Sequence, residues 1–236
     1  MKSFFTVIGG MGTMATELYV KMINRKTPAT NDQEYLDYIL VNYSTIPDRS
    51  SYIMDTSKPN PLPHLQEVIA QQSQLQPDFF TLTCNTAHYF YQDLVQSTDI
   101  PILHMPALAI ESIKMASGTR VGIIGTEGTI KNKIYDPFIE EAGYVAVHPS
   151  LQIQQKVSTL IFDKIKAKNE LDKELYYEIL DEMFTDFNCD VLVLGCTELS
   201  LSEDADPYPN GAVVDPQNIL ADRTVELALK KREERK

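Results

Sequence analysis

The chain has 236 residues, of which 43% are hydrophobic and 23% charged, with a net charge of −12 and a pI near 4.8. This composition is typical of a globular protein of one or two domains, and its negative charge argues against nucleic acid or an anionic membrane as a partner. Three cysteines without a Cys-x-x-Cys spacing, and four histidines without a His-x-x-x-His spacing, indicate neither a disulfide framework nor a metal site, so we expect a reducing, cytoplasmic location.

The first predicted elements are a strand at residues 4–8 and a helix at about 14–24, joined by a glycine-rich turn. The strand begins too early for a signal peptide, and no apolar stretch of the chain approaches the roughly 20 residues of a membrane span. Glycine permits a tight turn, and a helix start leaves N–H groups free for an anion. We therefore expect a carboxylate or a phosphate of the substrate to bind at Gly10, Met11, Gly12 and Thr13.

The same turn matches a loose dinucleotide fingerprint, with glycine at 10 and 12 and alanine at 15. Asp32 follows at about the distance of the acid that binds the ribose of such cofactors. However, Asp32 falls in a polar loop rather than at the carboxyl end of a strand. A nicotinamide-dependent oxidoreductase therefore stays open as a remote alternative.

A second strand is predicted at residues 38–43, and it leads into a loop at 44–50 that contains Arg49. Open parallel sheets bind ligands at the carboxyl ends of their strands, and the planar guanidinium group suits a carboxylate. We expect Arg49 to bind a carboxylate of the substrate. A surface ion pair with Asp48 is the alternative. A helix at about 62–74 follows.

Two cysteines occupy matching positions at the ends of buried strands. Cys84 follows the apolar run 79–82, and Cys196 follows the apolar run 191–194. Each is followed by residues that cap a helix, Asn-Thr in one case and Thr-Glu in the other. The positive end of a helix dipole lowers the pKa of a cysteine, so we expect these thiols to favour the thiolate. Cys189, at the other end of its strand, reads as a core residue.

The remaining segments alternate between strand and helix. The predicted strands lie at 100–105, 120–125 and 144–147, and the predicted helices at 87–97, 107–117, 153–166, 172–188 and 217–231. A loop is predicted at 203–211, and residues 213–216 precede the last helix. The strand at 120–125 enters a second glycine turn, which repeats the pattern of the N-terminus.

This repeat predicts two α/β halves of one plan. From Gly9 to Cys84 is 75 positions, and from Gly125 to Cys196 is 71 positions. We expect an α/β fold of two pseudo-symmetric parallel-sheet domains with the active site in the cleft between them. The first would comprise residues 1–105 and 213–236, and the second residues 106–212.

Two thiols that face one another suit the inversion of an amino acid. One thiolate removes the α-proton from one face, and the other thiol returns a proton to the opposite face. The site must also stabilise the enolate-like carboxylate with hydrogen-bond donors. We expect these from the glycine-turn amides and from Asn85, Thr86, Thr126 and Thr197. No lysine motif for pyridoxal phosphate is visible, so we expect no cofactor.

Five motifs together resemble a known family. They are GGMG at 9–12, IPDR at 46–49, CNTAH at 84–88, GCTEL at 195–199 and DP at 215–216. In this order they are similar to the motifs of the cofactor-independent aspartate/glutamate racemase superfamily, in its aspartate racemase branch. The resemblance implies two pseudo-symmetric α/β domains, a catalytic cysteine from each (Cys84 and Cys196), an acidic amino acid as substrate and a homodimer.

The resemblance also extends to the side-chain carboxylate of the substrate. The segment IFDKIKA at 161–167 is similar to a family segment whose lysine binds this group together with the arginine of the PDR loop. By register this lysine is Lys166, with Lys164 as the alternative. Glu198 stands where glutamate racemases tend to carry histidine. This difference indicates aspartate or a broader range of acidic substrates, and it places Glu198 in the site.

Other functions stay open from the sequence. Within the superfamily, the protein could be a maleate isomerase or a hydantoin racemase. From a different class, it could be a non-catalytic protein that binds an amino acid. Arg49 and Lys166 favour a dicarboxylate, which keeps maleate open as a substrate. Because the chain has Cys84, reversible racemisation is favoured over a one-directional variant, and racemisation of aspartate, or of glutamate as well, is the leading hypothesis.

Overall fold

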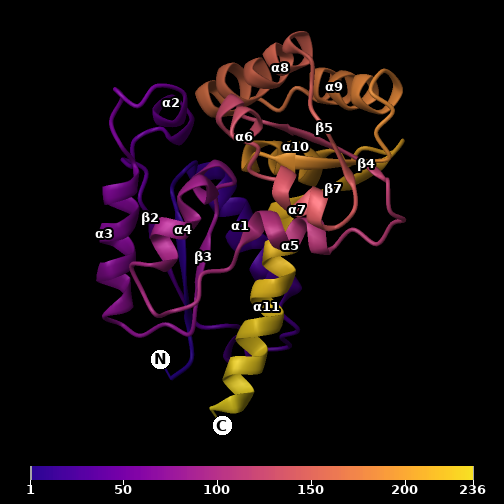
Figure 1. The fold of residues 1–236 in the computed structure, drawn as a ribbon. Coiled ribbons are helices and arrows are strands. Elements are labelled where there is room, and N and C mark those ends of the chain that lie inside the picture. The colour runs from indigo at the N-terminus through magenta and orange to yellow at the C-terminus, as the bar shows by residue number, and fades with distance from the viewer. Residues whose placement is uncertain (1, 236) are drawn as a thin grey trace.

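A computed structural model describes residues 2–235 as two parallel β-sheets with helices packed around them (Figure 1). The first sheet has the order β2-β1-β3 and contains β1 (Phe5–Gly9), β2 (Tyr38–Asn42) and β3 (Phe80–Leu82). The second has the order β5-β4-β6-β7 and contains β4 (Arg120–Gly125), β5 (Val145–Val147), β6 (Val191–Gly195) and β7 (Ala212–Val214). The α/β fold predicted from the sequence is confirmed.

The strands β1 and β6 are buried along their whole length, and β4 is buried beyond its first residue, as expected for parallel strands covered by helices on both faces. Gly125 of β4 pairs with Gly195 of β6, and a Cβ atom on Gly125 would lie 2.6 Å from the Gly195 carbonyl oxygen. The two glycines therefore let these strands approach closely at their carboxyl ends. This places the residues that follow them, Thr126 and Cys196, at the same edge of the sheet.

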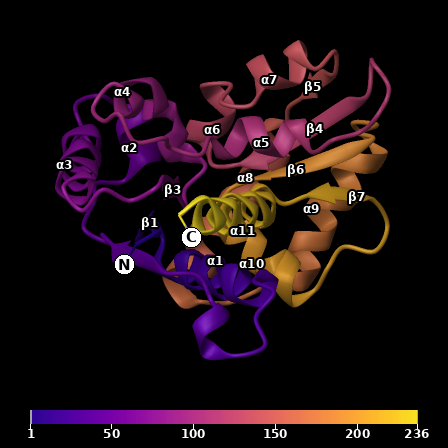
Figure 2. The same ribbon diagram turned by 90° about the horizontal axis from the view of Figure 1, so that it is seen from below.

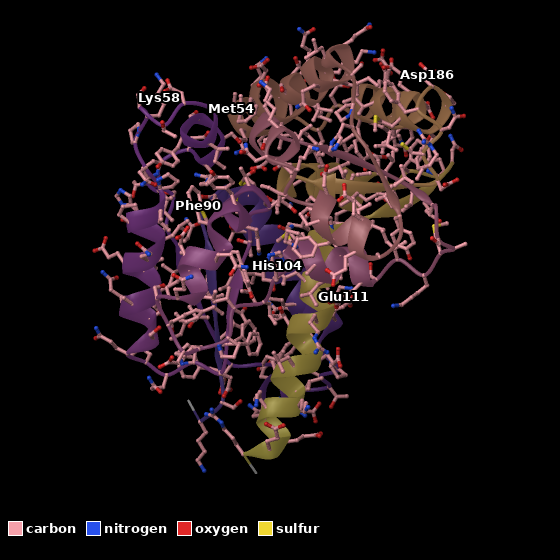
Figure 3. The ribbon with its side chains drawn as sticks, in the orientation of Figure 1. Met54, Lys58, Phe90, His104, Glu111 and Asp186 are labelled. Atoms are coloured by element: carbon pink, nitrogen blue, oxygen red, sulfur yellow. The ribbon has the colours of Figure 1, made fainter. Side chains whose placement is uncertain are left out.

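The helices of the first half surround its sheet. They are α1 (Thr13–Lys26), α2 (Arg49–Met54), α3 (Leu62–Ser73), the 3-10 helices η1 (Asp32–Glu34) and η2 (Thr86–Phe90), α4 (Tyr91–Val95) and α5 (Met105–Glu111). Asp48 caps α2 by accepting a hydrogen bond from the N–H of Ser51 at 2.7 Å. The ring of His104 caps α5 in the same way, at the crossing from the first half to the second (Figure 3).

The helices of the second half surround its sheet, and four of them begin at side-chain caps. They are α6 (Glu127–Lys131), α7 (Asp136–Glu141), α8 (Leu151–Ser158), the π-helix η3 (Thr159–Lys166), α9 (Lys173–Thr185), α10 (Thr197–Ala205) and α11 (Pro216–Glu234). Thr126, Ser150, Asp172 and Asp215 cap α6, α8, α9 and α11. None of the helices within residues 2–235 has the length and apolar character that crossing a membrane requires.

The last helix returns to the first half. α11 leaves β7 of the second sheet and packs against both α1 and α5 (Figure 2). Its apolar face shares a buried cluster with β1 and α1, which includes Leu220, Val225, Phe5 and Leu18. The hydroxyl of Tyr19 in α1 also lies 2.7 Å from that of Thr224 in α11. The assignment of residues 213–236 to the first domain stays a prediction. The packing of α11 against α1 and α5 is the contact on which this assignment depends.

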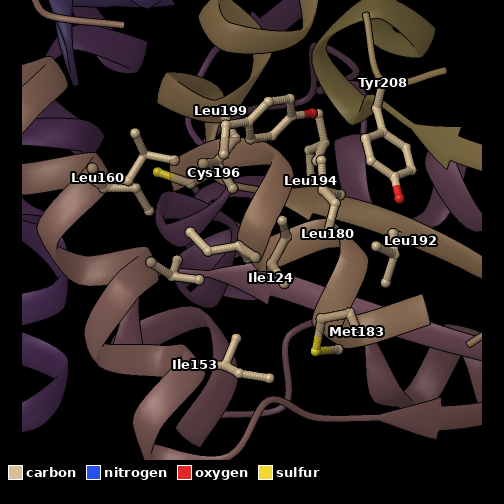
Figure 4. Packing of buried hydrophobic residues seen from close by; sticks show 14 of the residues in the cluster. Ile124, Ile153, Leu160, Leu180, Met183, Leu192, Leu194, Cys196, Leu199 and Tyr208 are labelled. Atoms are coloured by element: carbon tan, nitrogen blue, oxygen red, sulfur yellow. The ribbon is translucent and has the colours of Figure 1, made fainter. Parts of the chain in front are cut away.

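A second cluster fills the space between the second sheet and α8, α9 and η3. Figure 4 shows Cys196 at one side of this cluster, beside Leu160 and Leu199. Cys189 is buried in the same cluster, as predicted for a core residue.

Several predicted elements differ from the structure. The predicted helix at 87–97 is split into η2 and α4, and the predicted strand at 100–105 is reduced to a single bridge between Ile102 and Phe80. This strand stops because His104 already caps α5, which begins at Met105. The helix α5 also ends at Glu111 rather than at residue 117. The predicted loop at 203–211 begins later, because α10 continues to Ala205.

Candidate active site

Both cysteines line one small cavity between the two halves of the molecule. Each is only 4% exposed, and the cavity measures about 10 Å³. Its walls are Met11, Asp48, Arg49, Ser50, Cys84, Asn85 and Thr86 from the first half and Thr126, Lys166, Cys196, Thr197 and Glu198 from the second. Most of the residues singled out in the sequence therefore meet here.

The glycine turn lies mainly in a neighbouring cavity. Gly10, Gly12 and Thr13 line a space of about 330 Å³ that shares Lys166 and Glu198 with the first cavity. Gly10 adopts a φ of +91°, and its N–H donates to the hydroxyl of Thr16 at 3.0 Å. The amide of Gly10 is thus already used within the turn. Of the four turn residues, only Met11 lines the cavity that holds the cysteines.

Asn85 and Thr86, directly after Cys84, are held by residues of the second half. The hydroxyl of Tyr135 donates to Oδ1 of Asn85. The hydroxyl of Thr86 lies 3.0 Å from that of Thr126 and 3.1 Å from that of Thr129, and all three are buried. These contacts connect the end of β3 with the start of α6. Neither Tyr135 nor Thr129 carries a sequence signal that could have identified it.

The backbone of Cys84 is held by His88, the last residue of the CNTAH motif. The Nδ1 atom of His88 lies 2.8 Å from the carbonyl oxygen of Cys84, and its Nε2 accepts from the N–H of Met105 at 3.1 Å. Because Nε2 accepts, Nδ1 carries the proton and donates. Burial lowers the pKa of His88 to about 4, so the ring is neutral near pH 7.

Cys196 is hydrogen-bonded to Glu198. Its Sγ–H donates to Oε2 of Glu198 at 2.9 Å. Burial raises the pKa of Cys196 well above its usual range, the Glu198 carboxylate raises it further, and Lys166 opposes this only in part. The expectation that the helix start favours the thiolate is therefore wrong for Cys196 as it stands here. Loss of water and a neighbouring carboxylate outweigh the dipole of a nine-residue helix.

Lys166, at the end of η3, faces the other oxygen of Glu198. Its Nζ lies 3.5 Å from Oε1 of Glu198, and Lys164 instead pairs with Glu170 and Asp172 outside the cavity. Burial lowers the pKa of Lys166, but the negative charges of Glu198 and of the ionised forms of Cys196 and Cys84 raise it, and this pKa is raised overall. Of the two candidate lysines, only Lys166 lines the cavity.

Arg49 is almost fully buried and faces backbone oxygens. Its guanidinium group donates to the carbonyls of Pro47 at 3.0 Å, Ile46 at 3.3 Å and Met11 at 3.0 Å. Its Nε is buried and has no hydrogen-bond partner within residues 2–235. Arg49 thus joins the loop before α2 to the glycine turn, and it keeps one donor unused in the wall of the cavity.

The structure does not place Asp32 where a dinucleotide-binding site requires its acidic residue. Asp32 belongs to η1, which precedes β2, and its side chain is exposed. The acid of a dinucleotide site lies instead at the carboxyl end of a strand.

Comparison with known proteins agrees with the motifs. The pattern that defines the Asp/Glu/hydantoin racemase family matches residues 8–224. The chain is 31% identical over 125 residues to the broad specificity amino-acid racemase RacX of Bacillus subtilis, covering 52% of this chain and 53% of that protein. It is 29% identical over 151 residues to glutamate racemase of Persephonella marina, covering 61% and 56%. The chain spans about half the length of these relatives.

Two solved structures resemble the fold over nearly the whole chain. Aspartate racemase of Picrophilus torridus superposes with a TM-score of 0.81 at 25% identity, over 96% of this chain and 94% of that one. An aspartate racemase homologue of Pyrococcus horikoshii superposes with a TM-score of 0.76 at 21% identity, over 97% and 100%, which is a likeness of fold. With the family pattern matched over residues 8–224, the chain belongs to the Asp/Glu/hydantoin racemase family.

Proposed function

We propose that the protein racemises an acidic amino acid without a cofactor, with aspartate as the first substrate and glutamate as the second. The observation that carries this proposal is that Cys84 and Cys196, from opposite halves of the molecule, line one buried cavity. The family, the RacX relative and the aspartate racemase fold support an amino acid as the substrate.

In each direction of the proposed reaction, one cysteine takes a proton from the substrate and the other cysteine gives a proton to it. With one enantiomer bound, the thiolate of Cys84 takes the α-proton, and the electron pair of the broken C–H bond passes into an enolate-like carboxylate. The thiol of Cys196 then gives its proton to the opposite face and becomes the thiolate. The structure supports this order, since Cys196 carries the proton that it donates to Glu198. The reverse direction exchanges the roles of the two cysteines.

The charged groups of the cavity suit a dicarboxylic substrate. Lys166 and the free Nε of Arg49 supply positive charge for the side-chain carboxylate. Asn85, Thr86, Thr126 and Thr197 supply neutral donors for the α-carboxylate, which gains negative charge as the proton leaves. Lys166 is paired with Glu198 in this structure, so a bound substrate carboxylate would have to replace Glu198 as the partner of this lysine.

The test is incubation with L-aspartate in deuterated water without added cofactor, followed by NMR of the α-proton and chiral chromatography. We expect deuterium incorporation together with formation of D-aspartate. No exchange with either acidic amino acid would refute the proposal, and maleate and hydantoins in the same assay would then test the two related activities.

Three cysteine variants separate the thiols. Cys84→Ser and Cys196→Ser should each abolish racemisation, because serine is too weak an acid to replace a thiol. Cys189→Ser is the control, since this cysteine is buried at the opposite end of β6. Far-ultraviolet circular dichroism checks that each variant folds. Near wild-type racemisation by either cavity variant would exclude the two-base reaction.

The assembly and location of the protein also stay proposals. We propose a homodimer in the cytoplasm, as the family resemblance and the cysteine content suggest. Light scattering after gel filtration measures the oligomeric state directly.

A further inference from the structure

Tyr135 is a buried residue of the second half whose hydroxyl reaches into the first. It is 1% exposed, directly precedes α7 and donates its hydrogen bond to Oδ1 of Asn85. Burial raises the pKa of Tyr135 well above its usual range, with further contributions from Asp215 and the two cavity cysteines. The hydroxyl therefore keeps its proton, and this proton needs an acceptor.

Asn85 has one satisfied and one unsatisfied end. Its Oδ1 accepts from Tyr135, whereas its Nδ2 is buried and has no hydrogen-bond partner among residues 2–235. A buried donor without a partner is unfavourable, because it has lost its hydrogen bonds to water without gaining others. Asn85 also lines the cavity that holds Cys84 and Cys196. An unpartnered buried donor in the wall of such a cavity is suited to bind an acceptor on a ligand.

An amide side chain can turn over and exchange its two ends, and only one orientation presents the NH₂ group to the cavity. The bond from Tyr135 selects between the two orientations. If the amide turned over, the Tyr135 proton would lose its acceptor, and an oxygen rather than a donor would face the substrate. Repulsion between that oxygen and a carboxylate would weaken binding.

We propose that Tyr135 is a positioning residue, which holds the NH₂ group of Asn85 toward the cavity as a donor for the substrate's α-carboxylate. This inference rests on the proposed racemase function for its ligand. It assigns to the second half of the molecule the orientation of a binding group on the first half. The two halves would then have to meet before Asn85 is correctly oriented.

The kinetic test compares two buried tyrosines. Tyr135→Phe removes one oxygen, and kcat/KM for aspartate should fall at least tenfold. Tyr19→Phe is the matched control, because Tyr19 is equally buried and its hydroxyl pairs with Thr224 rather than with a cavity residue. Tyr19→Phe should change kcat/KM by less than twofold. Equal effects of the two variants would overturn the proposal.

A double-mutant cycle tests whether Tyr135 acts through Asn85. In an Asn85→Ala background, Tyr135→Phe should change kcat/KM by less than twofold. A further tenfold loss in that background would mean that Tyr135 acts by another route. Asn85→Asp provides a second variant that leaves Tyr135 intact. It keeps the acceptor and loses the donor, so it should lose at least as much activity as Asn85→Ala, and near wild-type activity would overturn the proposal.

An NMR measurement decides the orientation without any activity. In protein labelled with ¹⁵N at asparagine, the side-chain NH₂ signals of Asn85 are identified by their absence in Asn85→Ala. They should shift in Tyr135→Phe and stay unchanged in Tyr19→Phe. Unchanged signals in Tyr135→Phe would overturn the positioning role. If the wild-type protein does not racemise, the proposed function fails, and this measurement still decides whether Tyr135 orients Asn85.

Discussion

The hydrogen bond between Cys196 and Glu198 has a measurable effect on the acidity of the thiol. Glu198→Gln removes the negative charge beside the sulfur, and this charge disfavours the thiolate. We therefore expect the pKa of Cys196 to fall. The rate of alkylation by iodoacetamide, followed against pH in a Cys84→Ser background, reports this change.

Glu203→Gln is the control for that experiment. Glu203 lies in the same helix as Glu198, and its carboxylate accepts hydrogen bonds from Tyr176 and from the N–H of Tyr208, away from the cysteines. The alkylation profile of Cys196 should be the same with and without this change. If Glu198→Gln does not change the pH profile of Cys196 alkylation, burial alone sets the acidity of Cys196.

Arg49→Lys should affect both stability and substrate use. The guanidinium group donates to three backbone carbonyls from two segments, and a lysine cannot reach all three. We expect a loss of about 1–3 kcal/mol in the free energy of unfolding by urea. We also expect KM for aspartate to rise at least tenfold. An unchanged KM in folded protein would remove Arg49 from the binding of the substrate.

At the scale of the elements, the turn between β1 and α1 requires glycine for two reasons. Gly10 has a φ of +91°, and a Cβ atom there would lie 2.5 Å from a backbone atom of Tyr43. Gly10→Ala should therefore destabilise the protein by roughly 3 kcal/mol, from about 1 for the backbone conformation and the rest from the overlap. Urea unfolding measures this loss.

Gly118→Ala separates the two causes. Gly118 has a similar φ of +86°, but a Cβ atom there meets nothing within 4 Å. We expect a loss of only about 1 kcal/mol. Similar losses at both positions would mean that the β1–α1 turn adjusts to the added methyl group.

The sequence predicted elements well where periodicity or a cap marks them, and poorly where a tertiary contact decides. β1, β4 and β6 and the long helices α1, α9 and α11 follow from apolar patterning and caps. The split at η2 does not, because it depends on the His88 side chain returning to the Cys84 carbonyl. The π-helical form of η3, which ends at Lys166, likewise has no local signal.

The same limit applies to the candidate site. The matching strand ends pointed to the cysteines, the loop after the second strand pointed to Arg49, and Lys166 and Glu198 came from the family resemblance. The sequence could not show which of these groups are already paired in the folded chain. The contacts of Arg49 with carbonyls and of Lys166 with Glu198 arise only when distant segments meet. Tyr135 was missed for the same reason.

At the scale of the whole molecule, the junction of the two halves should be sensitive to acid. Burial lowers the pKa of His88 to about 4, and burial together with the His88 charge lowers the pKa of His104 to about 3. Between about pH 6.5 and pH 4, the unfolded chain therefore binds a proton on each of these two histidines, and the folded chain does not. The stability that the two neutral histidines contribute is fully present above about pH 6.5 and is lost as the pH drops through this window.

Asp215 acts in the opposite direction. Burial raises its pKa to about 6, so the folded chain binds a proton there that the unfolded chain binds only near pH 4. Between about pH 4 and 6, these three groups together give a net uptake of one proton on unfolding, or roughly 1.4 kcal/mol per pH unit.

Two variants test the signs by urea unfolding at several pH values. His104→Asn keeps an acceptor for the N–H of Ala107 and should make the pH dependence shallower by one proton. Asp215→Asn should make it steeper by one proton. An unchanged slope in either variant would contradict the assignment for that residue.

The small volume of the cysteine cavity bears on how the protein meets its substrate. A space of about 10 Å³ holds roughly one water molecule, so an amino acid can enter only if the two halves move apart. That movement must break the hydroxyl contacts of Thr86 with Thr126 and Thr129. Under the proposed racemase function, opening and closing would accompany every turnover and limit its rate. While the cavity is closed, the thiols are shielded from bulk water, so the protons that they transfer would be those bound before closure.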